Sequence, residues 1–473
     1  MTHSAKTNSI FWFRKDLRLS DNPGLHQAAQ KNAILPIFII DTTAALQIGQ
    51  ASQWWLVQSL EQLNVTLDNK LNVYVGDPKK IMLKLITEHS ISNVYWNICY
   101  EPAQNAQDLI IKKTLEKENV TVETFCGQLL WEPSDVVKKD GTPYKVFTPF
   151  YRNGCLQATP PRSPLPIPKN MDLIKDTKNH TSIENLFPDA LNQWDIKLSK
   201  IWKVGEKAAQ ARLKIFITQG LDGYKEGRNF PDHKNVSRLS AHLHFGEISP
   251  NQIWYAAQAP GVAASNTDVD CFLSELGWRE FSNTLLHFFP TLPDKNFNAK
   301  FDTFPWEYHA HLLTAWKQGQ TGYPIVDAGM RELAQTGYMH NRVRMVVASF
   351  LIKNLLIDWR HGKDWFWSCL VDADLANNSA SWQWVAGSGA DAAPYFRIFN
   401  PVLQGEKFDK HGDYTRFYVP ELSHLPDKYL HKPWLAPENI LTQAGIALGK
   451  EYPKPIINLE ASRKYALRAY KKI

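Results

Sequence analysis

The chain has 473 residues, of which 44% are hydrophobic and 21% charged, a balance typical of a globular protein with two domains. No apolar run approaches the roughly 18 residues of a membrane span, and the first residues lack the apolar core of a signal peptide, so we expect a soluble, intracellular protein. The five cysteines are scattered without a C-x-x-C pair, which argues against a disulfide framework and a zinc site. The net charge of +6 would suit a polyanionic partner if the basic residues cluster.

Short apolar runs alternate with helical patterns over the first 130 residues. Strands are predicted at 10–13, 34–40, 71–75, 94–96 and 120–124, and helices at 51–68, 78–89 and 102–118. This alternation predicts an α/β domain over residues 1–130 that contains a doubly wound parallel sheet. No G-x-G-x-x-G follows the first strand, so we expect a Rossmann-like domain without the dinucleotide-binding loop, and its ligand stays open.

The composition changes over residues 131–200, where the sequence PPRSPLPIP (160–168) and a polar stretch predict a long connector that runs over the surface. From 201 to 473 the pattern is helical almost throughout, which predicts an all-helical second domain. One helix start is marked by Ser249, with Pro250 at the first helical position and Gln252 completing a capping box.

The most informative segment is DADLANNSASWQW at residues 372–384, which combines carboxylates, amides and indoles. Such a run suits a pocket that hydrogen-bonds a polar planar heterocycle and also offers flat apolar faces. Trp382 and Trp384 point about 200° apart on a helix, so one could face a cofactor or the interior and the other a ligand. Asp372 and Asp374 could form a metal pair or a catalytic dyad. No third acid or histidine stands at a fixed spacing, so we expect no metal and favour hydrogen bonds to a ring N–H or a ribose hydroxyl.

Two helix faces carry residues suited to a nucleobase and its phosphates. Glu275, Trp278 and Arg279 share one face by their i, i+3, i+4 spacing, although a surface Glu–Arg pair beside a core Trp has the same pattern. Asn341 and Met345 share a similar face, flanked by arginines. Together these side chains could read a base edge, stack on the base and hold neighbouring phosphates.

The sequence SRLS (237–240) precedes an apolar helical run, where free N–H groups and Arg238 could bind an anion, or where the serines could simply cap the helix. The H-x-H pairs at 242–244 and 309–311 lack cysteine or acidic partners, which favours solvent-facing or packing roles over metal binding.

In this order, the motifs resemble those of the photolyase/cryptochrome flavoproteins, and most closely the bacterial class I cyclobutane pyrimidine dimer (CPD) DNA photolyases. The resemblance runs from end to end. It rests on FWFRKDLR (11–18), YKVFTP (144–149), SRLS (237–240), ELGWRE (275–280), GYPIVD (322–327), MHNR (339–342), residues 372–384 and YFRIFNPVLQGEK (395–407).

The resemblance implies a carbon–carbon lyase, a deoxyribodipyrimidine photo-lyase that repairs cyclobutane pyrimidine dimers with light. Excited FADH⁻ would donate an electron to the flipped-out dimer, the cyclobutane bonds would break, and the electron would return. It further implies FAD bound in the helical domain, UV-damaged DNA as partner, no membrane association, a monomer, and a cytoplasmic location at the bacterial nucleoid.

The resemblance also implies roles for individual residues. The catalytic set consists of Glu275 as hydrogen-bond partner of the dimer, Asn378 beside the flavin N5, and an electron-transfer chain formed by Trp306, Trp359 and Trp382. The cofactor would be bound by Tyr224, Ser237, Arg238, Leu239, Ser240, Phe272, Glu275, Arg344, Asp372, Ala373, Asp374 and Asn378. DNA and the lesion would be bound by Arg228, Glu275, Trp278, Arg279, Ser282, Asn341, Arg342, Met345, Trp384, Arg397, Gln404 and Lys407.

A second, antenna chromophore is possible. Folate-binding relatives carry Asn-Glu where this chain has Ala103 and Gln104, which counts against folate, and deazaflavin, another chromophore or none stay open. Val236, Phe272 and Tyr338 replace the usual Thr, Trp and Trp, changes expected to preserve the flavin pocket.

Three other functions fit part of this pattern. A (6-4) photoproduct photolyase would carry histidines at the positions of Asn341 and Met345. A cryptochrome-type blue-light receptor would often alter Glu275, Trp278 or Asn378 and add a long C-terminal extension. An electron-transfer flavoprotein without DNA would leave the Arg–Trp–Glu faces unexplained.

Overall fold

The computed structural model describes residues 7–473 except 31, 45, 179 and 393–395. The chain divides into two compact units, Met1–Asp222 with Ser237–Pro290, and Gly223–Val236 with Thr291–Ile473. The two units are defined by which residues pack together. The predicted boundary at residue 200 instead marks where the sequence pattern becomes helical. The boundary therefore stays a prediction.

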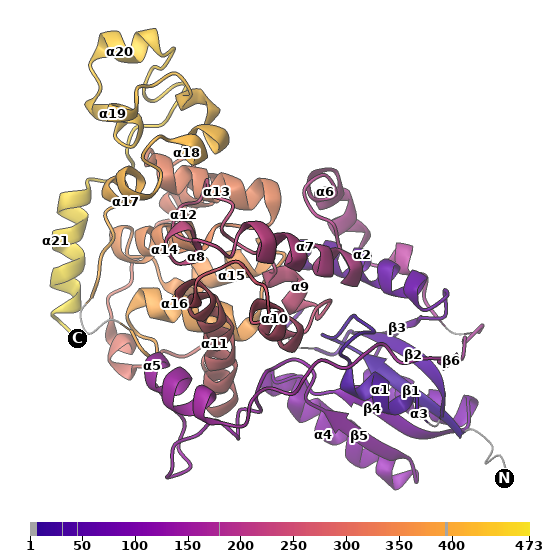
Figure 1. The fold of residues 1–473 in the computed structure, drawn as a ribbon. Coiled ribbons are helices and arrows are strands. Elements are labelled where there is room, and N and C mark those ends of the chain that lie inside the picture. The colour runs from indigo at the N-terminus through magenta and orange to yellow at the C-terminus, as the bar shows by residue number, and fades with distance from the viewer. Residues whose placement is uncertain (1–6, 31, 45, 179, 393–395) are drawn as a thin grey trace. The chain divides into compact units, whose positions relative to one another are not determined.

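The first unit contains a parallel sheet in the order β3-β2-β1-β4-β5 (Figure 1). Its strands are β1 (Thr7–Phe13), β2 (Asn32–Asp41), β3 (Asn72–Gly76), β4 (Ile91–Asn97) and β5 (Thr121–Phe125). The order changes direction between β1 and β4, as in a doubly wound sheet. The predicted α/β fold is confirmed, because apolar residues of the strands become buried in the sheet, as Ile10, Leu35 and Val94 are.

The predicted helices of this α/β domain correspond to α2 (Gln50–Thr66), α3 (Pro78–Glu88) and α4 (Pro102–Lys117). One helix was missed, α1 (Pro23–Ala28), because six residues are too few to show a helical period. The side chain of its N-cap, Asn22, accepts the N–H of Leu25 at 3.2 Å. This cap marks the start of the helix, where no helical period is visible.

The predicted connector, residues 131–200, contains regular elements, and its role as a connector stays a prediction. Two residues, β6 (Asp172–Leu173), pair with β2. The helix α6 (Pro188–Leu198) buries Trp194 and Leu198, and Asp195 on the same helix accepts the indole N–H of Trp54 at 2.9 Å. The apolar face of α6 spans too few residues to stand out from its polar surroundings.

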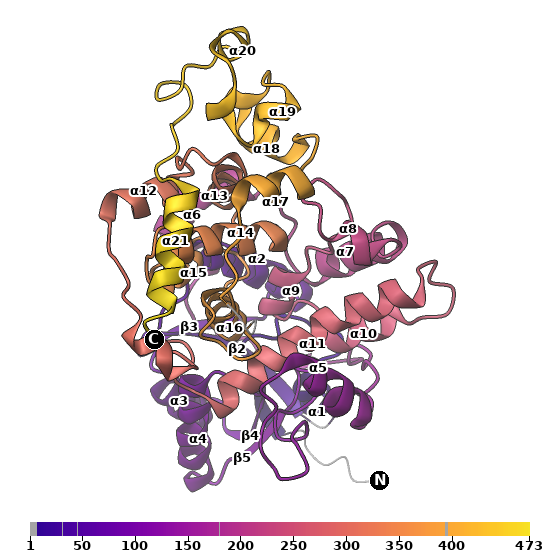
Figure 2. The same cartoon turned by 90° about the vertical axis from the view of Figure 1, so that its left-hand side faces the viewer.

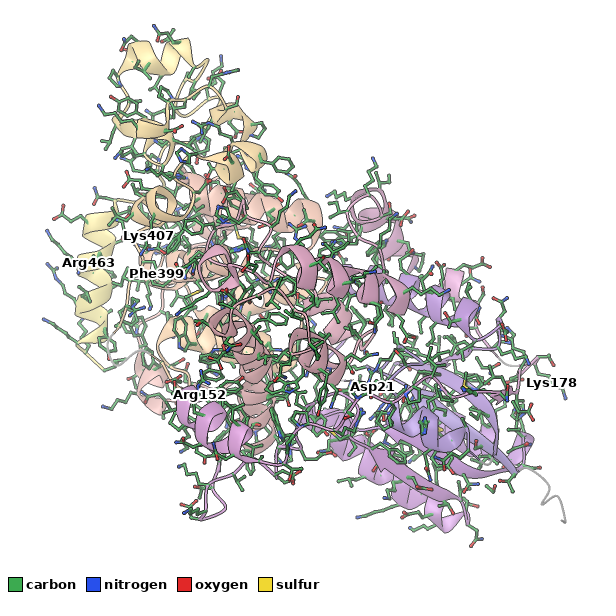
Figure 3. All side chains as sticks on the ribbon, in the orientation of Figure 1. Asp21, Arg152, Lys178, Phe399, Lys407 and Arg463 are labelled. Carbon is green, nitrogen blue, oxygen red and sulfur yellow. The ribbon has the colours of Figure 1, made fainter. Side chains whose placement is uncertain are left out.

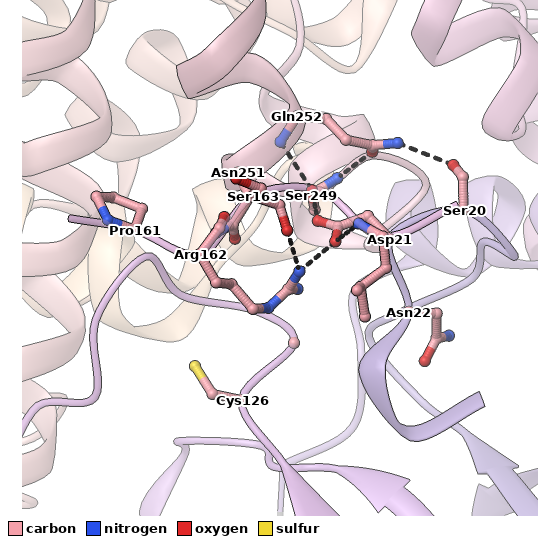
Figure 4. A network of polar contacts seen from close by, with 12 residues as sticks. Ser20, Asp21, Asn22, Cys126, Pro161, Arg162, Ser163, Ser249, Asn251 and Gln252 are labelled. Carbon is pink, nitrogen blue, oxygen red and sulfur yellow. Dashed lines mark hydrogen bonds and ion pairs between the residues drawn. The ribbon is translucent and has the colours of Figure 1, made fainter. Parts of the chain in front are cut away.

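The proline-rich part of this connector is fixed by Asp21, as Figure 4 shows. The buried carboxylate of Asp21 pairs with Arg162, accepts the N–H of Leu165 at 2.9 Å and accepts the hydroxyl of Ser249. The amide of Asn251 donates to the carbonyl of Arg162 at 2.8 Å. The connector is therefore tied to the loop after β1 and to the start of a helix.

That helix is α10 (Pro250–Ala257), and it begins as predicted. The hydroxyl of Ser249 accepts the N–H of Gln252 at 3.0 Å, and the Gln252 side chain accepts the N–H of Ser249 at 3.0 Å, which completes the capping box.

Beyond β6, the described residues form helices joined by loops, as expected for the second predicted domain. In the first unit these are α7 (Glu206–Gln219), α9 (Ser240–His244), α10 and α11 (Asn266–Phe288). In the second unit they are α8 (Tyr224–Gly227), α12 (Ala310–Gln318), α13 (Pro324–Thr336), α14 (Asn341–Ser349) with its continuation η5 (Phe350–Asn354), α15 (Trp359–Cys369), α16 (Leu375–Ala386), α17 (Pro401–Phe408), α18 (Asp413–Tyr418), α19 (Asp427–Leu430), α20 (Glu438–Gln443) and α21 (Leu459–Tyr470). Figure 2 shows α18, α19 and α20 grouped beyond α17 in this unit.

Short helical turns complete the fold. They are α5 (Phe147–Pro149), η1 (Phe150–Gly154), η2 (Cys155–Gln157), η3 (Ile183–Asn185), η4 (Ala299–Thr303), η6 (Pro420–Leu422) and η7 (Pro433–Leu435). Within the part of the chain that the structure describes, no helix is both long and apolar enough to cross a membrane.

Candidate functional site

An ion pair with a buried carboxylate joins α14 to the segment that precedes α16. Arg344 donates from Nη2 to both carboxylate oxygens of Asp372, at 2.8 and 3.1 Å, and from Nε to the carbonyl of Met339 at 2.8 Å. Burial alone would lower the pKa of Arg344, but the attraction of Asp372 outweighs it and raises the pKa above its ordinary value. Because an arginine already binds both of its oxygens, Asp372 is better suited to hydrogen-bond a ligand than to bind a metal ion.

The polar residues that follow Asp372 have separate tasks. Asp374 is the N-cap of α16 and accepts the backbone N–H of Asn377 at 2.8 Å and its side-chain amide at 2.9 Å. The amide nitrogen of Asn378 donates to the carbonyl of Lys363 on α15 at 3.1 Å. This bond orients the Asn378 amide, so that its carbonyl oxygen is the group that can accept a further hydrogen bond.

The two tryptophans of α16 contact different surroundings, as their spacing predicts. Trp382 is 3% exposed, and its ring meets Phe366 edge-on, with centroids 5.0 Å apart. Trp384 is half-buried, and its indole N–H donates to the carbonyl of Asp391 at 3.0 Å. Ala373, just before the helix, is buried.

The other tryptophans of the predicted electron-transfer chain also lie in the second unit. Trp359 is fully buried at the start of α15, and its indole N–H donates to Asn296 at 3.0 Å. Gly362, less than a turn later, lies so close to Trp382 that an added Cβ would be 2.1 Å from the ring. Trp306 is half-buried and has its ring centroid 4.3 Å from that of Phe304. Their role in electron transfer stays a prediction.

Cationic side chains gather around α14 and α17. The guanidinium carbon of Arg342 lies 4.5 Å from the ring centroid of Phe408, and the ammonium of Lys407 lies 5.2 Å from the same centroid. Figure 3 labels Lys407. Burial lowers the pKa of Arg342, and repulsion by Arg228 lowers it further. Arg228, Arg342 and Lys407 are called the cationic cluster below.

The remaining predicted residues of the second unit lie on α8, α14, α17 and the segment before α17. Asn341 is exposed at the first position of α14, and Gln404 is half-buried on α17. Arg397 is exposed in the segment before α17. Tyr224 is buried, and the guanidinium of Arg228 lies 5.4 Å from its ring centroid. Tyr395, which opens one of the motifs, lies outside the described residues.

In the first unit, α11 carries the predicted lesion-binding face. The ring of Trp278 stacks on Phe147, with centroids 3.8 Å apart and planes 9° apart. Arg279 donates to the carbonyl of Gln128 at 2.6 Å, and the buried hydroxyl of Ser282 donates to the carbonyl of Trp278 at 3.0 Å. These bonds hold Arg279 and Ser282 against their own unit, and their DNA-binding roles stay predictions.

Glu275 precedes Trp278 by three residues on α11 and is half-buried. A second acid on the same helix, Glu280, is fully buried and accepts the N–H groups of Leu130 at 2.9 Å and Trp131 at 3.4 Å. Burial raises the pKa of Glu280 to about 7.

The segment 237–240 differs from the expected helix start. Leu239, not a serine, is the N-cap of α9, and no side chain caps the helix. Ser240 is the first helical residue, and Arg238 has a left-handed backbone with φ of 53°. The capping alternative is therefore wrong. Phe272, also assigned to the cofactor, is buried with its ring centroid 4.6 Å from that of Phe216.

Three residues that contact predicted site residues were given no role in the sequence analysis. Phe147 stands inside the YKVFTP motif, which could have drawn attention to it. Phe408 and the buried Lys353 carry no local signal, because their positions depend on contacts with distant segments.

The histidine pair at 242–244 is buried, and His242 contacts Glu247.

Comparison with known proteins places these features in a family. Residues 9–169 match the family model described as DNA photolyase, and residues 272–472 match the FAD binding domain of DNA photolyase. The chain is 48% identical to a deoxyribodipyrimidine photo-lyase of Agrobacterium fabrum over 98% of this chain and 97% of the relative. The chain belongs to the photolyase/cryptochrome family.

Both branches of the photolyase/cryptochrome family are represented among the relatives. A crystal structure of a class III photolyase from Agrobacterium tumefaciens matches with a TM-score of 0.94 and 46% identity, covering 100% of this chain and 99% of that one. Cryptochrome-1 of Arabidopsis thaliana is 35% identical over 96% of this chain and 69% of the relative. The predictions of a photo-lyase enzyme, of FAD as a cofactor and of DNA as a partner are confirmed at this level. The predicted class I subgroup stays a prediction beside this class III relative.

Proposed function

We propose that the protein repairs cyclobutane pyrimidine dimers in UV-damaged DNA, as a monomer that uses light and reduced FAD. The observation that carries this proposal is the position of Arg342, a member of the cationic cluster that also contacts an uncharged side chain. Its Nη1 lies 3.9 Å from the sulfur of Met345, and its guanidinium carbon lies 4.5 Å from the ring centroid of Phe408. A soft, uncharged surface bordered by cations suits an uncharged pair of fused pyrimidines and the phosphates that flank it.

The polar residues near α16 fit the flavin nucleotide. Asp372, held by Arg344, and Asp374 offer carboxylate oxygens to donors of the ring system and the ribose. Asn378 is oriented by the carbonyl of Lys363 and would place its own oxygen toward the flavin N5. Reduced FAD, when bound, supplies the excited-state electron. The task of these residues is to hold and orient it.

The proposed lesion contacts on α11 are preorganised. Trp278 is fixed by its stacking on Phe147, which gives the lesion a flat apolar wall with little conformational freedom left to lose. Glu275 would hydrogen-bond the dimer and stabilise its negative charge in the reaction. Trp384 of the second unit stays a predicted lesion contact.

The cationic cluster would bind the DNA backbone together with Arg397 and Gln404. Like charges held close together repel one another, and a phosphate relieves that repulsion while releasing counterions. We expect the logarithm of the DNA affinity to fall linearly with the logarithm of the salt concentration. The slope should be roughly −0.9 per phosphate contacted.

The direct test is a repair assay. The purified protein, with flavin verified as bound and reduced, is incubated with an oligonucleotide that carries one thymine cyclobutane dimer, in blue light or in the dark. Light-dependent recovery of intact thymines supports the proposal. No recovery would contradict it, and a parallel oligonucleotide with a (6-4) photoproduct would show whether that lesion is the substrate. Inactivity on both lesions would favour a light receptor of the cryptochrome type.

A further inference from the structure

A small pocket lies beside Trp384 within the second unit. It is lined by residues of α14, η5, α16 and the segment before α17, namely Ser349, Lys353, Trp384, Val385, Gly387, Arg397 and Phe399. The space that these residues border measures ≈ 330 Å³ and includes open solvent. Figure 3 marks Phe399 on this unit. None of the described lining residues is a carboxylate, whereas two are cations.

Lys353 is the unusual member of this lining. The residue is 4% exposed, its ammonium donates to the carbonyl of Arg397, and its Nζ lies 4.6 Å from the ring centroid of Phe396. An ammonium has three N–H donors, and the Arg397 carbonyl takes one of them. Burial lowers the pKa of Lys353 to about 7, and repulsion by Arg397 contributes. Burying a charged lysine without a carboxylate among the other lining residues is costly, so a bound anion would favour the charged form of Lys353.

The rest of the lining is arranged to meet such an anion. The hydroxyl of Ser349 accepts the N–H of Phe399 at 3.2 Å, so its own hydrogen can be donated to a second acceptor. The indole N–H of Trp384 already donates to Asp391. Trp384 therefore contributes apolar surface to the pocket rather than a hydrogen bond.

We propose that this pocket binds one phosphate group, with Lys353 and Arg397 supplying the charge and Ser349 a hydroxyl donor. The inference rests on the proposed function in one respect, because it takes the phosphate from the damaged DNA strand. Trp384 would then contact the nucleoside attached to that phosphate. Free inorganic phosphate has the same chemistry and is the alternative source.

The test compares Lys353→Met with Lys450→Met. Both variants remove one positive charge, but Lys450 is 83% exposed and pairs with Glu451 on the surface. Affinity for a duplex with a single thymine dimer is measured over a range of salt concentrations. We expect the slope of log affinity against log salt to be smaller by about 0.9 in Lys353→Met and unchanged in Lys450→Met, as for the loss of one phosphate contact.

A second measurement separates the two sources of phosphate. The melting temperature of each variant, without DNA, is followed as inorganic phosphate replaces chloride at constant ionic strength. Stabilisation by phosphate that Lys353→Met abolishes, without a change of the DNA slope, would assign the pocket to free phosphate. An unchanged DNA slope together with unchanged phosphate stabilisation overturns the proposal. If the unaltered protein failed to bind or repair dimer-containing DNA, the proposed function would fail, and the phosphate titration would still test the pocket.

Discussion

Arg344 and Asp372 form a two-bonded ion pair, with N···O distances of 2.8 and 3.1 Å, between α14 and the residues that precede α16. The pair joins the helix that carries Asn341 and Met345 to the helix that carries Asn378. The proposed lesion-binding and flavin-binding residues of the second unit are thus connected through one ion pair, whose carboxylate is buried. A change at either partner is expected to affect both groups.

Arg344→Met should destabilise the protein by roughly 3 kcal/mol, because removing one partner leaves a buried charge uncompensated. It should also lower the flavin content. Chemical denaturation and the ratio of flavin to protein absorbance measure the two effects. Arg360→Met is the matched control, since Arg360 pairs with Asp358 near the surface and its loss should cost about 1 kcal/mol or less. Equal effects of the two substitutions would contradict the assigned importance of the buried pair.

Glu275→Ala should reduce the repair yield while leaving flavin bound. The reason is that Glu275 is proposed to stabilise negative charge on the dimer, and losing one such interaction typically lowers a rate by roughly 10²-fold. Glu275→Gln keeps the size and a hydrogen-bonding group and should retain more activity. Loss of flavin from Glu275→Ala would show that the residue is structural.

Stability should depend on pH through Glu280. The pKa of this buried acid is raised from 4.5 to about 7, so the folded protein keeps a proton that the unfolded chain has released. The stability contributed by the protonated acid is fully present below about pH 4.5 and is lost as the pH rises through about 7. Glu280→Gln should flatten the decline of unfolding free energy across this window, measured against the unaltered protein. Identical pH profiles would disprove the assignment.

Gly362→Ala should displace Trp382, because the added methyl would lie 2.1 Å from its ring. Such overpacking typically costs about 1–3 kcal/mol. If Trp382 passes electrons to the flavin, light-driven reduction of the oxidised flavin should also slow, and transient absorption measures that rate.

Gly261→Ala is the control for this substitution. No atom lies within 4 Å of its added methyl, but its φ of 88° strains an alanine, so it destabilises the protein without moving Trp382. Its rate of flavin reduction should match that of the unaltered protein. An unchanged rate in Gly362→Ala with an intact fold would remove Trp382 from the electron path.

Local pattern was sufficient to predict several elements. The apolar runs at 34–40 and 71–75 became parallel strands, and Ser249 with Gln252 formed the expected cap, because these features depend on neighbouring residues alone. The opposed surroundings of Trp382 and Trp384 followed from helical geometry in the same way.

Contacts between distant segments could not be predicted. Phe147 and Trp278 stand far apart in the sequence, no pattern links them, and only the fold brings their ring centroids to 3.8 Å. Lys353 looks like any surface lysine in the sequence, and its burial results from packing of η5 against other elements. The five residues of α9 were too few to reveal that Leu239 would take the capping position.

The attachment of the proline-rich connector also determines where the chain can be cut. Asp21 donates its backbone N–H to the carbonyl of Leu165 at 2.9 Å, and its carboxylate accepts the N–H of the same residue at 2.9 Å and binds Arg162. A protease needs several residues of extended, accessible backbone, and this segment offers them only after these bonds open together. Cleavage at 160–168 would therefore follow the fraction of molecules in which this segment is detached, which makes the stretch a reporter of that local opening.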